Sequence, residues 1–276
     1  GLNSCLDAND SVNYRCAPGA TQICGTCAWQ KFAVRAAPVR SNFAGSPLTT
    51  NNMLSFMIVF SEPAPSSLSI SRLLGAIKIS HLHKNQLSSL PVEPFDGLRA
   101  LKYLNIRDNQ LSSLPVRLLD GLDALQYLYL NGYQLTSLPA EIFDGLGALR
   151  GLLLGNNELA SVSAGIFGGL DALIFCDSLY ENQLASLPAG IFYGLDTLQY
   201  LYLCSSELAS LPAGLFDGND GLRTIYLNGN QLDSLPVELL GGLCSLRKLY
   251  LHDNQLASFP TGLLDGLDAL QLLRVV

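Results

Sequence analysis

The sequence predicts a protein of the α/β class, built as a solenoid with a concave parallel β-sheet and a convex side of loops and short 3₁₀ turns. One observation is an internal repeat of 24 residues, with one unit of 25. An Asn or its substitute marks the same position in each unit. Another is the alternation of apolar and polar residues in each unit, which is typical of a strand with one buried face. The repeated positions are Asn85, Asn109, Tyr133, Asn157, Asn182, Ser206, Asn230 and Asn254.

Composition limits the classes of function. The chain has 276 residues, 49% of them hydrophobic and 14% charged, which suits a large core. No apolar run is long enough to span a bilayer, so no membrane span is expected. A net charge of −7 argues against a nucleic-acid partner, because a phosphate backbone requires clustered Lys and Arg.

Residues 1–66 form a predicted Cys-rich N-terminal segment and linker, which match no repeat. Cys5, Cys16, Cys24 and Cys27 are an even number of cysteines in a short polar stretch, which favours two disulfides and an extracellular or secretory compartment. A zinc site is the alternative, but "CGTC" has no second cysteine pair to complete four ligands. The sequon at Asn9 is compatible with glycosylation and secretion.

Residues 67–276 form the predicted solenoid. In one unit, Leu104 and Ile106 alternate with polar or aromatic neighbours, so the two apolar side chains face inward. No single unit buries its leucines alone, so the units stack and their strands form one sheet. Prolines on the return path disfavour a helix there. Phenylalanines are expected to hold the return path to the core: Phe95, Phe143, Phe167, Phe192 and Phe216.

The unit pattern L-x-x-L-x-L-x-x-N-x-L-x-x-L-P-x-x-x-F-x-G-L resembles the leucine-rich repeat family. Its 24-residue form is similar to the extracellular type of variable lymphocyte receptors and Toll-like receptors, and it covers about residues 68–276. The N-terminal segment does not show the CPxxCxC opening of that family's caps, so the disulfide pairing stays open. The resemblance implies an immune-receptor-like recognition module.

The repeated Asn is expected to face inward and to satisfy backbone groups that the tight turn leaves unpaired. Ser206 can do part of this. We expect Tyr133 to swing outward, at a cost of about 1 to 2 kcal/mol. Tyr133 is then either a tolerated irregularity or an aromatic contact.

Other units are irregular as well. One unit has an extra residue and carries Cys176 at a core Leu position, which predicts a bulge near Asp177 and Ser178. Asn219 also occupies a core Leu position, which predicts a loose turn. The chain stops within a unit at "LQLLRVV", so we expect a partner or further chain to cover this end.

The cysteines of the repeats are not expected to pair with one another. Cys204 stands three residues further along its strand than the neighbour of Cys176, which places the two beyond the reach of a disulfide. Cys244 lies further away. Cys204 is expected on the concave surface, where a maleimide reagent would label it while sparing Cys176.

Side chains that alternate with the buried leucines are expected on the concave face, where rigid aromatic rings with a polar tip favour binding. Asn105 and Arg107 would orient a ligand beside them. Duplication of one Tyr-bearing unit is the alternative origin of this stripe. The aromatic residues are Tyr103, Tyr127, Tyr129, Phe175, Tyr180, Tyr200, Tyr202, Tyr226 and Tyr250.

An enzyme is not predicted. His81 and His83 lie two residues apart, but no third metal ligand is evident, and no catalytic motif or cofactor-binding loop is found. The sequence therefore predicts an extracellular recognition module, without metal or cofactor, that binds a protein or glycan through its concave face. The alternative is a structural or scaffold subunit of a larger assembly.

Overall fold

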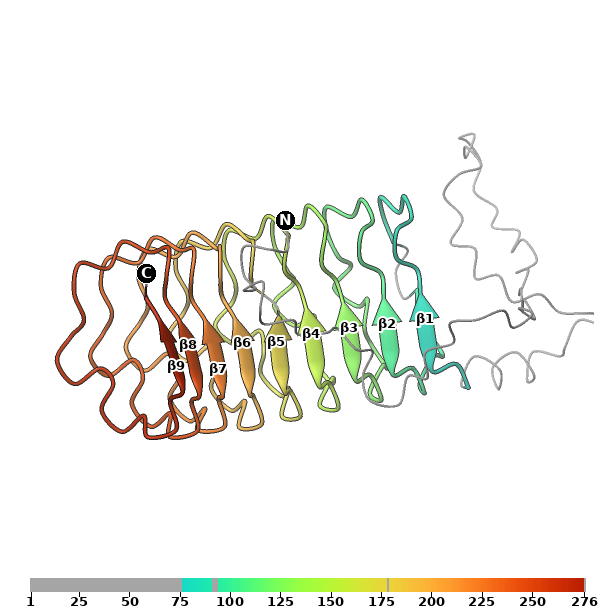
Figure 1. The fold of residues 1–276 in the computed structure, drawn as a ribbon. Coiled ribbons are helices and arrows are strands. Elements are labelled where there is room, and N and C mark those ends of the chain that lie inside the picture. The colour runs from blue at the N-terminus through green and yellow to red at the C-terminus, as the bar shows by residue number, and fades with distance from the viewer. Residues whose placement is uncertain (1–75, 91–93, 178, 276) are drawn as a thin grey trace, which may run out of the picture. The chain divides into compact units, whose positions relative to one another are not determined.

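A computed structural model describes residues 76–90, 94–177 and 179–275, which form a stack of coils with one strand in each coil (Figure 1). The Cys-rich segment and Asn9 lie outside the described residues, so the domain boundary after residue 66 stays a prediction. The strands are β1 (Ile79–His81), β2 (Tyr103–Asn105), β3 (Tyr127–Tyr129), β4 (Gly151–Leu153), β5 (Phe175–Asp177), β6 (Tyr200–Tyr202), β7 (Thr224–Tyr226), β8 (Lys248–Tyr250) and β9 (Leu272–Arg274).

The strands pair in chain order as one parallel sheet, which confirms the predicted solenoid. The register advances by one unit at each step, so that Leu104 pairs with Leu128 and Ile225 with Leu249. Strands β5 and β6 pair through Phe175 with Tyr200 and Cys176 with Leu201. The extra residue of this unit lies between the buried Cys176 and Leu179, because two residues separate them where other units have one.

The core consists of the middle strand residues and the leucines that flank them, most of which have no exposed surface. On the return path, Phe143, Phe167, Phe192 and Phe216 form a buried column, with neighbouring ring centroids 6.0–6.3 Å apart. This column confirms that these phenylalanines hold the return path to the core. Each ring packs against the next unit, so the core is continuous between coils.

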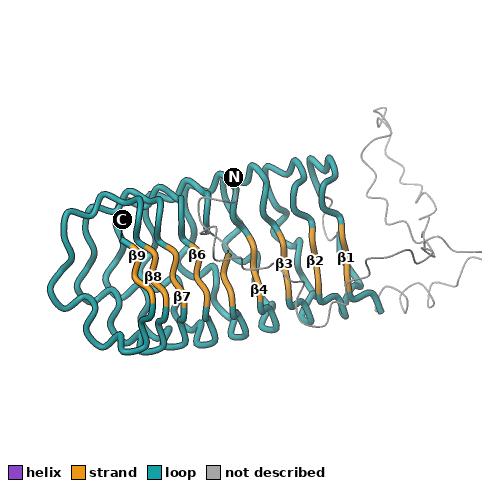
Figure 2. Tube along the Cα trace, viewed as in Figure 1, coloured by secondary structure: helices purple, strands orange, loops and turns teal. Residues whose placement is uncertain are grey.

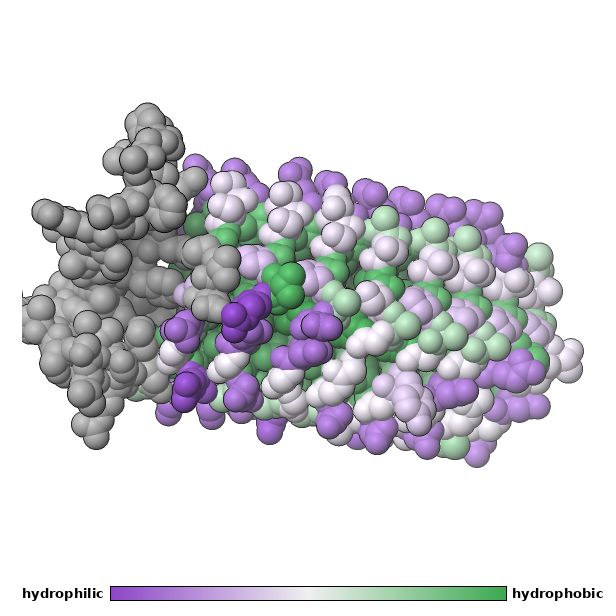
Figure 3. Space-filling view, turned by 180° about the vertical axis from the view of Figure 1, so that it is seen from behind, coloured by the Kyte–Doolittle hydropathy of each residue, from purple (hydrophilic) through white to green (hydrophobic). Residues whose placement is uncertain are grey.

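The return path consists of turns, and no helix is found within the described ranges (Figure 2). The turns are closed by bonds between residues three apart, such as Leu118 N to Pro115 O at 3.1 Å. That part of the chain therefore contains no helix able to cross a membrane. Seen from behind, hydrophilic residues line the two long borders of the solenoid, with less polar residues between them (Figure 3).

After each of the strands β1 to β8 the chain turns at one residue with a left-handed backbone, directly before the repeated Asn position. Asp108 has φ 54° and Gly132 has φ 79°. This conformation is uncommon for residues other than Gly, and its recurrence shows that the turn geometry is common to the units. Its members are Lys84, Asp108, Gly132, Asn156, Glu181, Ser205, Gly229 and Asp253.

The repeated Asn faces inward and links its own coil to the preceding one, as predicted. Asn157 Nδ2 donates to Leu154 O at 2.6 Å within its own unit and to Leu130 O at 3.2 Å in the preceding unit. Its Oδ1 accepts from Leu135 N at 3.3 Å. Asn109, Asn230 and Asn254 make corresponding bonds. The amide thus serves as both donor and acceptor for the buried turn.

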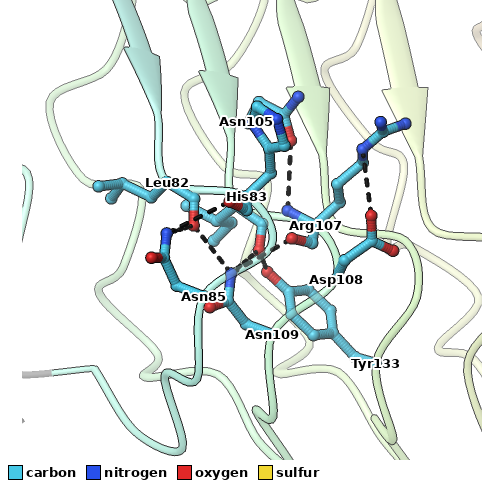
Figure 4. A network of polar contacts seen from close by, with 9 residues as sticks. Leu82, His83, Asn85, Asn105, Arg107, Asp108, Asn109 and Tyr133 are labelled. Atoms are coloured by element: carbon cyan, nitrogen blue, oxygen red, sulfur yellow. Dashed lines mark hydrogen bonds and ion pairs between the residues drawn. The ribbon is translucent and has the colours of Figure 1, made fainter.

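Tyr133 also faces inward, so the prediction that it swings outward is wrong. Its side chain is 5% exposed, and its hydroxyl donates to Ile106 O, which also accepts from Asn109 Nδ2 (Figure 4). The phenol is long enough to reach the carbonyl that an Asn in this position would reach. It has no amide oxygen, however, to accept from Leu111 N as Asn157 does from Leu135 N.

The other two substitutions are also accommodated. Ser206 Oγ donates to Leu179 O, which replaces part of the Asn function as predicted. Asn219 does not leave a loose turn, because its buried Nδ2 donates to Phe192 O at 3.0 Å and to Leu195 O at 3.3 Å. A polar side chain in a Leu position therefore ties its turn to the preceding unit by hydrogen bonds.

Candidate recognition surface on the parallel sheet

Two rows of side chains lie on the face of the sheet opposite the leucine core, and a third row lies directly before the strands. Row one is the residue before each strand, row two is the first strand residue, and row three is the third. Backbone bonds align row one, because Lys102 N and Tyr103 N both donate to Lys78 O, at 2.8 and 3.1 Å, and this pair of bonds recurs up to Arg247 O. Neighbours in a row are therefore about 5 Å apart.

Row two holds an aromatic stack in the N-terminal half. The rings of Tyr103 and Tyr127 are 4.8 Å apart and nearly parallel, at 7°. Phe175 continues this stack, with its ring 6.0 Å from that of Tyr127, although strand β4 lies between them. The gap is closed because β4 has Gly151 in row two, and a Cβ there would overlap the Phe175 ring.

Row three holds a second stack in the C-terminal half. The rings of Tyr202, Tyr226 and Tyr250 follow one another at 4.6 and 4.5 Å, within 11° of parallel. Tyr180 and Cys204 join Tyr226 and Tyr250 in one buried cluster. Such stacks hold the rings in fixed orientations.

The predicted aromatic residues differ in how accessible they are. Tyr200 is exposed at 36%, whereas Tyr226 and Tyr250 are buried at 2% and 1% and Tyr180 at 6%. The remaining five are half-buried: Tyr103, Tyr127, Tyr129, Phe175 and Tyr202. The accessible part of the stripe therefore lies in its N-terminal half and around β6.

The polar pair Asn105 and Arg107 lies at the end of β2. Asn105 Oδ1 accepts from Arg107 N at 3.3 Å, and Arg107 Nε lies 3.4 Å from Asp108 Oδ2 (Figure 4). Both side chains are half-buried, so they retain some surface for a ligand. The ion pair orients the guanidinium but is partly solvated, and such pairs stabilise the fold by about 1 kcal/mol or less.

The Tyr127 hydroxyl keeps its proton at neutral pH. Burial raises the pKa of Tyr127, and Tyr103 adds to that shift while Arg150 opposes it. A protonated phenol can both donate and accept a hydrogen bond. The Tyr127 hydroxyl is thus a neutral group that can serve as donor or acceptor.

Two further predictions on this face concern Cys204 and the histidines. Cys204 is disulfide-bonded and has no exposed surface, so the prediction of an accessible thiol is wrong. It packs against large rings that the linear register did not reveal. No disulfide joins Cys176 to Cys244. The rings of His81 and His83 meet edge to face at 5.7 Å, and burial, followed by the charge of His83, lowers the pKa of His81.

Row one was missed by the sequence analysis, which considered the aromatic positions and the total charge. This row carries five basic residues, all on one line of backbone bonds. Aligning the units on the first core position would have found them, because four of the five directly follow the Leu at that position and Lys78 follows Ile77 there. The five residues are Lys78, Lys102, Arg150, Arg223 and Arg247.

Comparison with known proteins identifies the family to which the repeats of this chain belong. The model of the leucine rich repeat family matches residues 81–135, 178–232 and 220–276, and the chain belongs to that family. No curated protein matches the sequence.

Solved structures share the solenoid. The structure of the Toll–Spatzle complex from Drosophila matches with a TM-score of 0.69 and 28% identity, over 75% of this chain and 28% of that chain. A leucine-rich repeat protein of Leptospira interrogans has a TM-score of 0.66 and 30% identity, over 75% and 50% of the two chains. The complex of TLR13 with the RNA ssRNA13 has 0.67 and 28%, over 74% and 29%.

The matched part of this chain spans half or less of those three chains. The family and these likenesses support a protein-interaction or recognition module.

Proposed function

We propose that the solenoid is the recognition module of an extracellular, receptor-like protein and that it binds a protein partner through the three rows across its sheet. The proposal does not include catalysis. The observation that carries it is the set of accessible tyrosines, which are already held in place. Tyr103 and Tyr127 stack on each other at 4.8 Å, and Tyr202 stacks on Tyr226 at 4.6 Å, yet Tyr103, Tyr127 and Tyr202 are only half-buried.

This arrangement favours binding for an energetic reason. Ordering a flexible side chain at an interface costs about 0.5 to 1.5 kcal/mol, and the stacks have already restricted these rings. The remaining surface combines apolar ring edges with neutral hydroxyl groups, which suits a protein or a glycan. We favour a protein, because the rows run across all nine strands and offer a long contact surface.

The test uses Tyr127, Tyr200 and Tyr202, replaced together by Ala. Tyr226 is left unchanged, because it is buried at 2% and its loss would disturb the row-three stack itself. The wild-type and triple-variant proteins are used for affinity capture from the native source, followed by mass spectrometry. If each ring is an anchor worth about 2 kcal/mol, the captured partner is lost from the variant.

The matched control is Tyr193→Ala, because Tyr193 is 76% exposed and lies on the return path. This variant should capture the same partner as the wild type. Circular dichroism must show that the triple variant remains folded. Unchanged capture by a folded triple variant would refute binding through the sheet.

A scaffold function is the second candidate, and the outer strand favours it. Leu273 of β9 pairs with the buried Leu249 in register, yet it is 38% exposed, and Leu264 is 39% exposed. We propose that further chain or a partner covers these side chains in an assembly. In a Leu273→Glu variant, loss of the captured partner together with unchanged capture by the tyrosine triple variant would favour the scaffold.

A further inference from the structure

Charge is separated between the sheet and the rest of the solenoid. The three rows hold seven Lys or Arg residues and one Asp, whereas the other described residues hold four Lys or Arg and eighteen Asp or Glu. The basic residues therefore gather on the sheet and directly before its strands, in a chain whose net charge is −7. Separation of this kind creates a positive local electrostatic potential on a molecule whose net charge is negative.

The five basic residues of row one have side chains available for a partner. Lys78, Arg150, Arg223 and Arg247 are exposed, and Lys102 is half-buried. Within the described part of the chain, none of the five forms an ion pair or a side-chain hydrogen bond. Their charge is thus not neutralised by a direct contact there.

Building on the proposed function, we propose that the protein partner presents a local group of Asp or Glu carboxylates to row one. Lys78 and Lys102 stand on adjacent units, as do Arg223 and Arg247. The two pairs are about 25 Å apart along the row, since five strand spacings of about 5 Å separate Lys102 from Arg223. An acidic segment of at least about seven extended residues spans this distance, and a folded acidic surface of the same width does so as well.

The surroundings favour a protein over a uniformly anionic polymer. Exposed aspartates precede row one by three residues in five units, as Asp123 precedes Gln126 and Asp220 precedes Arg223. A nucleic acid or a sulfated glycan is charged at every residue, so it would be repelled by these aspartates and by the net charge of −7. A protein can place its carboxylates only where the basic residues are.

The aromatic stacks point the same way. Single-stranded nucleic acids bind by stacking bases on open aromatic faces. Tyr103 and Tyr127 cover each other at an interplanar angle of 7°, so the facing sides of these rings are already occupied. Their hydroxyl groups remain suited to hydrogen bonds with carboxylate oxygens.

Fluorescence anisotropy tests the inference with the full chain. The probes are a labelled 12-residue peptide containing five Glu, the same peptide with Gln at those five positions, a 12-nucleotide single-stranded RNA and a heparin dodecasaccharide. We expect the Glu peptide to bind in preference to the other three. Replacing Arg223 and Arg247 by Gln should weaken it about tenfold, at about threefold for each exposed charge pair.

The matched control replaces Arg99 and Arg117 by Gln, which removes the same charge outside the three rows and should leave binding of the Glu peptide unchanged. Equal weakening in both double variants would overturn the role of row one. Stronger binding of RNA or heparin, equal binding of the Gln peptide, or no binding of any probe would overturn the acidic protein partner.

Sedimentation analysis at the same concentrations examines a second copy of this chain as the occupant. A dimer of the wild-type protein that dissociates in the Arg223→Gln, Arg247→Gln variant would overturn a separate partner. Failure here is distinguishable from failure of the proposed function. If the tyrosine triple variant loses the captured partner while the arginine variant retains it, recognition by the sheet stands and the acidic-partner inference fails.

Discussion

Replacing Asn157 by Ala should destabilise the solenoid far more than removing the hydroxyl of Tyr133, although both residues hold the same position in their units. Asn157 makes three buried hydrogen bonds, to Leu130 O at 3.2 Å, Leu154 O at 2.6 Å and Leu135 N at 3.3 Å. Each bond contributes about 1 kcal/mol, and stranding a buried group costs more. We therefore expect Asn157→Ala to lower the free energy of unfolding by about 3 to 4 kcal/mol.

Tyr133→Phe removes one hydrogen bond, the one to Ile106 O. That carbonyl keeps its bond from Asn109 Nδ2 at 2.6 Å, so no acceptor is stranded. The ring continues to fill its buried space. We expect this variant to lower the free energy of unfolding by less than about 1 kcal/mol.

Urea denaturation followed by far-ultraviolet circular dichroism measures both variants. Asn156→Gly is the control, because Asn156 is exposed and has φ 57°, which Gly adopts without strain. It should stay within about 0.5 kcal/mol of the wild type. If Tyr133→Phe costs as much as Asn157→Ala, the explanation of how Tyr133 is tolerated is wrong.

Three further outcomes are expected. Burial raises the pKa of Tyr133, so above about pH 10 the folded protein keeps the phenol proton while the unfolded chain loses it. The free energy of unfolding should therefore fall above that pH, and it should fall less steeply in Tyr133→Phe. Urea midpoints measured across that pH range will show the difference. Gly155→Ala should lower the free energy of unfolding by about 1 to 3 kcal/mol, because a Cβ would overlap the ring of Tyr180. In a double-mutant cycle, the cost of Gly155→Ala should be smaller when Tyr180 is already replaced by Ala. Additive costs of the two substitutions would contradict that overlap. A maleimide reagent should label the exposed Cys244 and spare the buried Cys176 under native conditions, as peptide mapping will show.

The repeat period allowed much of the solenoid to be predicted. The strands around Leu104 and Ile225, the buried phenylalanine column and the inward Asn follow from a pattern in which every unit has the same environment. The side-chain period of two assigns each strand residue to a face. Positions that keep the pattern were therefore predicted correctly.

Positions that break the pattern were predicted less well. Tyr133 was placed outside, because the sequence shows that an Asn is missing but not that Ile106 O lies within reach of a phenol. Asn219 was expected to loosen its turn, because the sequence does not show that two backbone acceptors of the preceding unit lie within its reach. Both outcomes depend on distances between coils, which a linear register does not contain.

The sequence by itself determined the order and direction of the strands, the leucine core and the face on which the strand tyrosines lie. These properties depend on local periodicity, which each unit carries in its own residues. Only the tertiary structure decided which tyrosines are accessible. Tyr202 is half-buried and Tyr250 is 1% exposed, although both hold row three, since exposure depends on which side chains neighbouring elements place around a ring. The line of basic residues in row one likewise exists only once stacking brings residues of separate units about 5 Å apart.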